Sequence, residues 1–224
     1  MSLLQPRQPP SFLWLRLVER RIGLLPSGTL SLLGARRAAT NLSIKLSKFR
    51  ELDDSVLIEQ AQDGDRRAFS ELVRRHQTVV YRTSYRILGD REDAKDASQE
   101  AFIRAYRKLD TFRGLSTFRT WMLRVATNVS LNEYSRRELP RAEGAAAEDI
   151  PAPNAPETEL MKSEATARIH EALRLVQPNH RAAIVLHDLE GLSYRETAEV
   201  LGSTEGTARS WAYRGRKRLK ELLT

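Results

Sequence analysis

The chain has 224 residues, with 37 Lys and Arg against 29 Asp and Glu, which gives a formal net charge of +8. This length suits two small domains, and no run of about 18 apolar residues is present that could span a membrane. The sequence contains no Cys, which excludes a disulfide scaffold, a thiolate zinc site and a cysteine nucleophile. Residues 1–50 hold nine basic residues and one acid, so the rest of the chain has no net charge and its overall charge does not indicate nucleic-acid binding.

The leading segment, residues 1–50, is rich in Arg and Leu and nearly free of acids. Such a composition is typical of an organellar transit peptide, whereas a secretory signal fits less well because Arg16 interrupts the apolar run. A wrongly assigned start, placed upstream of the folded part, is a third interpretation. We interpret this segment as a disordered basic extension and leave it out of the fold prediction.

From residue 51 onward, apolar residues recur at helical spacing, and no alternating stretch of useful length predicts a strand. Asp53 or Asp54 can cap a first helix, which Gly64 and its flanking Asp residues end. Gly89 and Gly114 interrupt the helical pattern further along the chain. We expect further helical segments over residues 68–88, 92–109 and 117–137, separated at these two glycines.

A stretch of different composition, residues 138–159, separates two helical parts of the chain. It contains four Pro, many Ala, six acids and one Arg, which is typical of a flexible acidic linker. Helical spacing returns near residue 160, and Pro178 opens a further helix. The predicted fold class is therefore all-α, with two small helical modules at residues 51–137 and 160–224.

The sharpest local pattern lies at residues 192–204. Ser193 and Glu196 fit a capping box at the start of a short helix, Gly202 permits a tight turn, and Thr204 can cap a second helix. A short helix, a glycine turn and a second helix form a helix-turn-helix. On the second helix, Ala208, Ala212, Gly215 and Leu219 share a face that can pack inward, and Thr207, Ser210, Trp211, Arg214, Lys217 and Arg218 lie on the other.

The charge of this second helix agrees with a role in DNA binding. Residues 203–224 carry six basic and two acidic residues. In a major groove, Arg side chains can read guanine edges while Lys side chains bind phosphates. A solvated basic face on an ordinary terminal helix is the alternative, but the large aromatic Trp211 on that face argues against it.

The segment over residues 90–109 has an acidic face and an apolar face. Asp93, Asp96 and Glu100 share the acidic face, with Gln99 beside it. Such a face could dock on a basic protein surface, although a merely solvated face explains the same pattern.

Residues 113–137 interleave aromatic side chains with five Arg and a single Glu. Aromatic rings and cations together suit single-stranded DNA, because bases stack on the rings and phosphates pair with Arg. The alternative is that the aromatic residues, Trp121 among them, belong to the helical core. Asn128 and Asn132 add amide groups that can hydrogen-bond to a base edge.

Three segments, in the expected order, resemble one family. Residues 93–102 (DAKDASQEAF) resemble the polymerase-docking motif of sigma factors, and residues 112–128 (FRGLSTFRTWMLRVATN) resemble the promoter-melting segment of the extracytoplasmic-function (ECF, group 4) sigma factors. Residues 193–219 resemble the helix-turn-helix with which that group reads the −35 promoter element. The chain therefore resembles an ECF sigma factor of the sigma-70 family, with a linker where larger sigma factors carry an extra domain.

This resemblance implies an alternative sigma factor that binds core RNA polymerase and directs promoter recognition, DNA melting and transcription initiation at a specific regulon. It implies a specificity subunit rather than an enzyme, with no catalytic residue, no metal and no cofactor. The implied partners are the coiled coil of the largest polymerase subunit, the flap of the second-largest subunit, promoter DNA and an anti-sigma factor. The implied location is the bacterial cytoplasm, where a membrane-anchored anti-sigma factor could hold the protein at the membrane.

The resemblance also assigns roles to individual residues. The loop 113–117 would receive a base flipped out of the −10 element. The expected polymerase contacts are Asp93, Asp96, Gln99 and Glu100. The expected −10 contacts are Arg113, Ser116, Thr117, Arg119, Trp121, Arg124, Asn128 and Asn132. The expected −35 contacts are Thr204, Thr207, Arg209, Ser210, Trp211, Arg214, Lys217 and Arg218.

Two other functions fit parts of this sequence less well. A stand-alone helix-turn-helix regulator would use residues 51–137 for ligand binding or dimerisation, but nothing in them indicates a ligand pocket. An enzyme acting on nucleic acid would need a carboxylate cluster, metal ligands or a phosphate loop. His180 and His187 are seven residues apart, which favours a core or surface role over metal binding.

One departure from the family pattern is Thr197, which stands where an apolar residue is usual.

Overall fold

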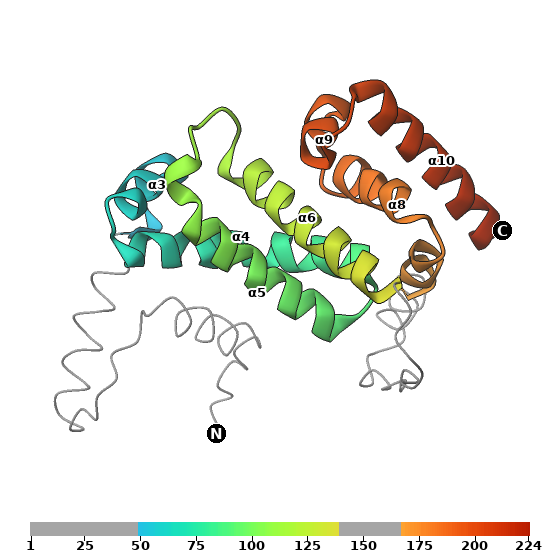
Figure 1. The fold of residues 1–224 in the computed structure, drawn as a ribbon, viewed down its shortest axis with the longest axis horizontal. Coiled ribbons are helices and arrows are strands. Elements are labelled where there is room, and N and C mark those ends of the chain that lie inside the picture. The colour runs from blue at the N-terminus through green and yellow to red at the C-terminus, as the bar shows by residue number, and fades with distance from the viewer. Residues whose placement is uncertain (1–48, 139–166) are drawn as a thin grey trace, which may run out of the picture. The chain divides into compact units, whose positions relative to one another are not determined.

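The computed structural model describes residues 49–138 and 167–224, drawn as coloured ribbon in Figure 1. The predicted basic extension up to residue 48 and the predicted linker from residue 139 onward lie outside the described residues. Within the described ranges, the regular secondary structure is helical and contains no strand. The all-α fold class is therefore confirmed.

The helices follow the predicted segments closely. The segment predicted over 92–109 ends at Arg107 and continues as a 3₁₀ turn over Leu109–Thr111. A helix over 167–174 precedes Pro178. A π turn that the sequence did not predict, Val185–Leu189, extends the helix that Pro178 begins. The main helices are α3 (Asp54–Gln62), α4 (Arg66–Leu88), α5 (Arg91–Arg107), α6 (Phe118–Glu138), α8 (Pro178–Ile184), α9 (Tyr194–Leu201) and α10 (Glu205–Leu223).

The described residues form two compact units, which do not follow the order of the chain. The first comprises residues 49–77 and 102–118, and the second comprises residues 78–101, 119–138 and 167–224. Helices α4 and α5 each contribute to both units.

The core of the first unit contains side chains from α3, α4 and α5. Leu57, Phe69 and Phe102 are completely buried, and the rings of Phe69 and Tyr106 lie 4.9 Å apart between centroids. Full burial of an apolar side chain of this size contributes about 1.5–3 kcal/mol, so each of these side chains stabilises the unit appreciably.

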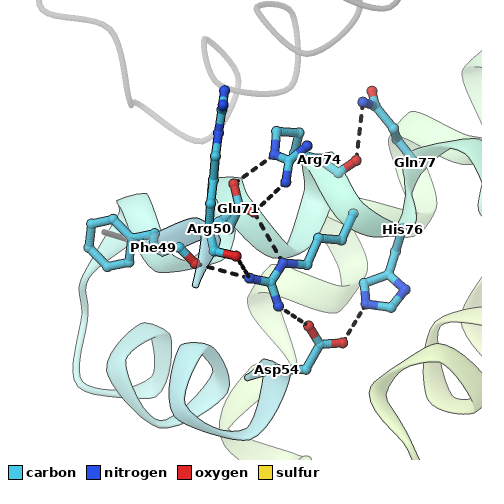
Figure 2. A network of polar contacts seen from close by, with 8 residues as sticks. Phe49, Arg50, Asp54, Glu71, Arg74, His76 and Gln77 are labelled. Carbon is cyan, nitrogen blue, oxygen red and sulfur yellow. Dashed lines mark hydrogen bonds and ion pairs between the residues drawn. The ribbon is translucent and has the colours of Figure 1, made fainter. Parts of the chain in front are cut away.

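A polar network joins α3 and α4 at the edge of this core (Figure 2). Arg75 donates to Asp54 Oδ1 at 2.8 Å and to the carbonyl oxygens of Phe49 and Arg50 at 3.0 and 3.2 Å. His76 Nε2 lies 2.7 Å from the other carboxylate oxygen of Asp54. Residues 49 and 50 are thereby held against α4, so the folded part includes two residues that the sequence analysis assigned to the extension.

Glu71 completes the network from one turn earlier on α4. Its carboxylate accepts hydrogen bonds from Arg74 at 2.6 and 2.7 Å and from Arg75 at 3.1 Å. Burial by itself would raise the pKa of Glu71, but the two guanidinium groups outweigh that effect and hold the pKa below its usual value.

In the second unit, the C-terminal helices pack on α4 and α6 through apolar side chains. Leu123 of α6 is buried with Leu186, Leu192 and Val200, and Val79 of α4 packs against this cluster. A second cluster joins Ile87 of α4 to Ala182 and Val185, with the partly buried Leu131 of α6 and Leu201 packed against it. The hydrophobic face of α8 and α9 therefore lies against the segment that the resemblance assigns to promoter melting.

Gly215 explains how closely α10 approaches α8. A Cβ atom at this position would lie 2.5 Å from Ile184 Cδ1 and 3.0 Å from the carbonyl oxygen of His180. A Cβ atom here would displace the Ile184 side chain and crowd the His180 carbonyl, which favours glycine although glycine in a helix interior costs about 1 kcal/mol relative to alanine.

Candidate nucleic-acid interface

The helix-turn-helix has the caps that the sequence predicted. Ser193 Oγ accepts the backbone N–H of Glu196, and the Glu196 carboxylate accepts the backbone N–H of Ser193 at 2.9 Å, so the capping box is complete. The hydrogen bonds from the Ser193 backbone and side chain lower the pKa of Glu196. Gly202 follows α9 in the left-handed region with φ of 61°, and Thr204 Oγ1 accepts the backbone N–H of Thr207 at the start of α10.

The two faces of α10 are largely as predicted. Ala208, Ala212 and Gly215 are buried, while Leu219 is only partly covered. The outward face divides into an exposed set and a half-buried set. The exposed members are Thr204, Arg209, Arg214, Lys217 and Arg218, and the half-buried members are Thr207, Ser210 and Trp211.

Several cations of α10 already have local partners. Arg209 pairs with Glu205 at 3.0 Å and lies over the ring of Tyr194, and Arg218 pairs with Glu221 at 3.2 Å. Within the described ranges, Arg214 and Lys217 have no carboxylate at ion-pair distance. Lys220, which is also exposed, has none either in these ranges, so these three cations are available on α10 for a phosphate or a base.

Arg216 lies on the second helix of the helix-turn-helix, and the sequence analysis did not assign it a role. It donates to Asp188 at 3.0 Å and to Tyr194 Oη at 3.1 Å, and so ties α10 to the start of α9. The sequence signal was weak, because an Arg among several on a basic helix cannot be assigned a partner before the turn geometry is known.

The loop 113–117 is held at both of its ends within the first unit. Gln62 Nε2 donates to the carbonyl oxygens of Leu109 and Phe112 at 2.9 and 3.1 Å. The Phe112 ring meets the Phe118 ring edge-on, with 5.9 Å between centroids. In the loop itself, Arg113 and Thr117 are exposed and Ser116 is half-buried. A loop whose two ends are held in place and whose tip is exposed is suited to receive a ligand.

Candidate residues from the rest of the −10 segment line one face of α6. Arg124, Asn128 and Asn132 are exposed and spaced by four residues, which places them in one row. Trp121 is half-buried, so its ring belongs neither wholly to the core nor wholly to the surface. The buried side of the same helix carries Leu123.

Arg119 is engaged in this structure by a carboxylate from the C-terminal segment. Its guanidinium donates to Glu190 Oε2 at 2.8 Å and to the Glu190 carbonyl oxygen at 3.0 Å. Arg86 Nη1 donates to Glu190 Oε1 at 2.7 Å, and Arg82 lies at 3.4 Å from Oε2. The sequence analysis did not identify Arg82, Arg86 or Glu190 as site residues, since Glu190 lies more than 100 positions from the two arginines.

The predicted polymerase-docking residues differ in exposure. Asp96 is exposed, and Asp93 and Glu100 are partly exposed, so three carboxylates lie along one side of α5. Gln99 is 6% exposed and contributes little to that surface. Asp93 forms an ion pair with Arg137 near the end of α6.

His187 in the C-terminal segment has a structural role. His187 Nδ1 lies 2.7 Å from the carbonyl oxygen of Leu192, and its ring stacks on Tyr194. Among residues 49–138 and 167–224, no three His, Cys, Asp or Glu side chains gather in an arrangement that could hold a metal ion. In the same ranges, no helix is long and apolar enough to cross a membrane.

Comparisons with known proteins show the family. The pattern of Sigma-70 region 2 matches residues 72–139, and that of Sigma-70, region 4 matches residues 166–219. The RNA polymerase sigma-H factor of Pseudomonas aeruginosa is 35% identical over 180 residues, which cover 76% of this chain and 93% of that protein. This chain belongs to the ECF sigma factors of the sigma-70 family. The prediction of a polymerase specificity subunit, rather than an enzyme, is thereby confirmed.

Other relatives agree with this assignment. The ECF RNA polymerase sigma factor SigE of Mycolicibacterium smegmatis is 42% identical over 198 residues, covering 80% of this sigma factor and 76% of that protein. The structure of CnrH in complex with the cytosolic domain of CnrY matches with a TM-score of 0.57 and 26% identity, over 76% of this chain and 96% of that chain. The Bartonella quintana sigma factor RpoE, solved with the anti-sigma factor NepR, has the same fold with a TM-score of 0.54 and 22% identity, over 69% and 96%.

Proposed function

We propose that this sigma factor binds core RNA polymerase through α5, reads the −10 element with the loop 113–117 and α6, and reads the −35 element with α10. The observation that carries the proposal is the helix-turn-helix, whose two caps and left-handed Gly202 present the basic face of α10. A helix presented in this way fits the major groove, where Arg and Lys contact base edges and phosphates.

Polymerase docking is assigned to the carboxylate side of α5. Asp93, Asp96 and Glu100 offer negative charge to a basic coiled coil of the largest subunit, and the exposure of Asp96 makes it the principal contact. Gln99 belongs to the proposed contact set, but its side chain is only 6% exposed in this structure. The flap of the second-largest subunit is the proposed partner of residues 160–224.

Promoter melting is assigned to the fixed loop and the row on α6. A base flipped from the −10 element would enter the loop 113–117, and unstacking a base in an open strand costs only a few kcal/mol. Arg113, Ser116, Thr117 and Arg119 would hold the backbone near that base. Along α6, the proposed contacts are Trp121, Arg124, Asn128 and Asn132.

The linker of residues 138–159 would allow residues 51–137 and 160–224 to reach separate elements. The polymerase would then set the spacing between the two elements, and the free protein would bind promoter duplex weakly. An anti-sigma factor is a further proposed partner, supported by the similarity to CnrH, which was solved with the cytosolic domain of CnrY. We place the protein in the bacterial cytoplasm, with membrane attachment only through such a partner.

Transcription from a promoter library tests the proposal. Core bacterial RNA polymerase is assayed with and without the full-length chain, and initiation sites are sequenced. New initiation at a shared pair of motifs, absent with core alone, is the expected result. If a folded chain produces no initiation and does not co-purify with core, the proposal is wrong and the stand-alone helix-turn-helix regulator replaces it.

A further inference from the structure

Three arginines converge on a single carboxylate in the second unit. The side chain of Glu190 is completely buried, and it receives Arg86 and Arg119 at 2.7 and 2.8 Å and Arg82 at 3.4 Å. One bidentate guanidinium would be sufficient to neutralise a buried carboxylate. The three guanidinium groups therefore carry two more positive charges than the Glu190 carboxylate neutralises, and the Glu196 carboxylate interacts at longer range with Arg119 alone.

The arginines come from one part of the chain and the carboxylate from another. Arg82 and Arg86 lie one turn apart on α4, and Arg119 is in the first turn of α6, whereas Glu190 follows the π turn after α8. Within the region 2 match, the three guanidinium groups thus form a cationic surface of their own. Glu190 reaches that surface from the region 4 match.

The arginine surface is not fully covered by Glu190. The side chains of Arg82 and Arg119 remain 49% and 37% exposed, while Arg86 is 20% exposed. Burial is the main effect that lowers the pKa of Arg86, which shows that packing it here disfavours its charge. Planar guanidinium groups that meet around one point match the oxygens of a phosphate group better than a single carboxylate does.

We propose that Arg82, Arg86 and Arg119 form a binding site for a backbone phosphate of promoter DNA, and that Glu190 occupies this site as an intramolecular competitor. The proposal rests on the proposed function, because a sigma factor brings promoter DNA to the region 2 segment that contains Arg119. DNA binding at this site then requires release of Glu190, and with it of the apolar contacts that α8 and α9 make with Leu123 and Ile87.

Binding of a random-sequence single-stranded DNA to the full-length chain, without polymerase, tests the competition. Glu190→Gln removes the charge of the competitor but keeps its shape. We expect the variant to bind the DNA about tenfold more tightly, which corresponds to a binding-competent state that is populated about one-tenth of the time in the unmodified chain. Glu171→Gln, at a side chain that is 71% exposed, makes the same charge change elsewhere and is the control. An equal gain in the two variants would overturn the role of Glu190.

The salt dependence of the same binding tests the arginine site. Each phosphate contact on a single strand contributes about 0.7 to the slope of log K against log salt. Because Arg82→Gln and Arg86→Gln each remove one of the three cations around a single phosphate, each should reduce the slope by a part of that amount. Lys108→Gln removes an exposed cation outside the cluster and controls for net charge. Slopes equal to that of the control would overturn the site. If Glu190→Gln does not fold, Arg82→Gln decides, because two arginines still neutralise Glu190 in that variant.

Spin labels measure the release directly. Since the chain contains no Cys, Glu92→Cys and Arg195→Cys place two unique labels at side chains that are 80% and 82% exposed. The distance between them should lengthen when the DNA is added, and should be longer without DNA in the Glu190→Gln variant. An unchanged distance with DNA bound would contradict the competition. Because these assays contain no polymerase, their failure would leave initiation in the promoter-library assay unaffected, which keeps the two proposals separable.

Discussion

The guanidinium of Arg181 in α8 donates a hydrogen bond to the carbonyl oxygen of Ile87, in the last turn of α4. The same side chain donates to the carbonyl oxygens of Arg174 and Val176 at 2.6 and 2.9 Å and lies 5.1 Å from the ring centre of Tyr134. Carbonyls at helix ends have no partner within their own helix, so one buried Arg satisfies the ends of two helices.

Replacement of Arg181 with Met should lower the free energy of unfolding by about 3 kcal/mol, because two buried carbonyl groups and one partly buried carbonyl group lose their donor. Arg181→Lys should be intermediate, since an ammonium lacks the planar fork that reaches all three. Urea denaturation followed by circular dichroism measures the loss. Arg195→Met, at an exposed position, should change stability by less than about 0.5 kcal/mol. Equal effects of the two Met variants would show that Arg181 is not a structural link.

The Glu71 network predicts a pH dependence of stability. Because the pKa of Glu71 is lowered in the folded state, its contribution is present above the unfolded pKa and is lost as the pH falls through the folded pKa. Glu71→Gln should therefore cost about 1–2 kcal/mol at neutral pH, and the difference from the unmodified chain should shrink near pH 3. Urea titrations at several pH values measure this convergence. A difference that stays constant with pH would contradict it.

Thr197 gives a prediction of increased stability. Its side chain is completely buried in α9, and among the described residues its Oγ1 has no hydrogen-bond partner. Thr197→Val keeps the shape and removes the unpaired hydroxyl, so the free energy of unfolding should rise by about 1 kcal/mol. Thr197→Ser keeps the hydroxyl and removes a methyl group, and should lower stability by a similar amount. Thermal unfolding distinguishes the two directions.

Charge reversal at Asp96 should separate polymerase docking from DNA binding. Asp96→Lys places a cation on the exposed carboxylate face of α5, and like charges at an interface cost several kcal/mol, so affinity for core polymerase should fall more than tenfold. Binding of the full-length chain to DNA without polymerase should not weaken. Asp63→Lys, at an exposed position away from α5, is the matched control. Loss of both activities in a folded Asp96 variant would refute this division of roles.

Arg214 tests the assignment of α10 to the −35 element. Its exposed side chain has no carboxylate partner in the described ranges, so Arg214→Ala should weaken promoter binding by the holoenzyme by about 1–3 kcal/mol if the side chain reads a base. The loss should depend on the sequence of the −35 element. Lys108→Ala removes the same charge at an exposed site elsewhere. A loss that is equal for all −35 sequences would make Arg214 a phosphate contact only.

Local signals in the sequence were sufficient for most of the helices. The capping box of Ser193 and Glu196 and the left-handed turn at Gly202 depend on residues within a few positions of one another, and both were predicted correctly. The inward face of α10 followed from helical spacing, because Ala208 and Ala212 recur at four residues. The π turn over Val185–Leu189 has no comparable local signature and was missed.

The amino-acid sequence by itself determined the helical class and most helix ends, because caps, glycine turns and helical periodicity depend on neighbouring residues, and three local motifs carried the resemblance to the family. Only the tertiary structure decided that Glu190 meets Arg82, Arg86 and Arg119, and that Arg181 reaches Ile87. Each of these contacts joins residues separated by more than 70 positions. The partner of a charged side chain at that separation depends on how whole helices pack, and no spacing rule along the chain encodes it.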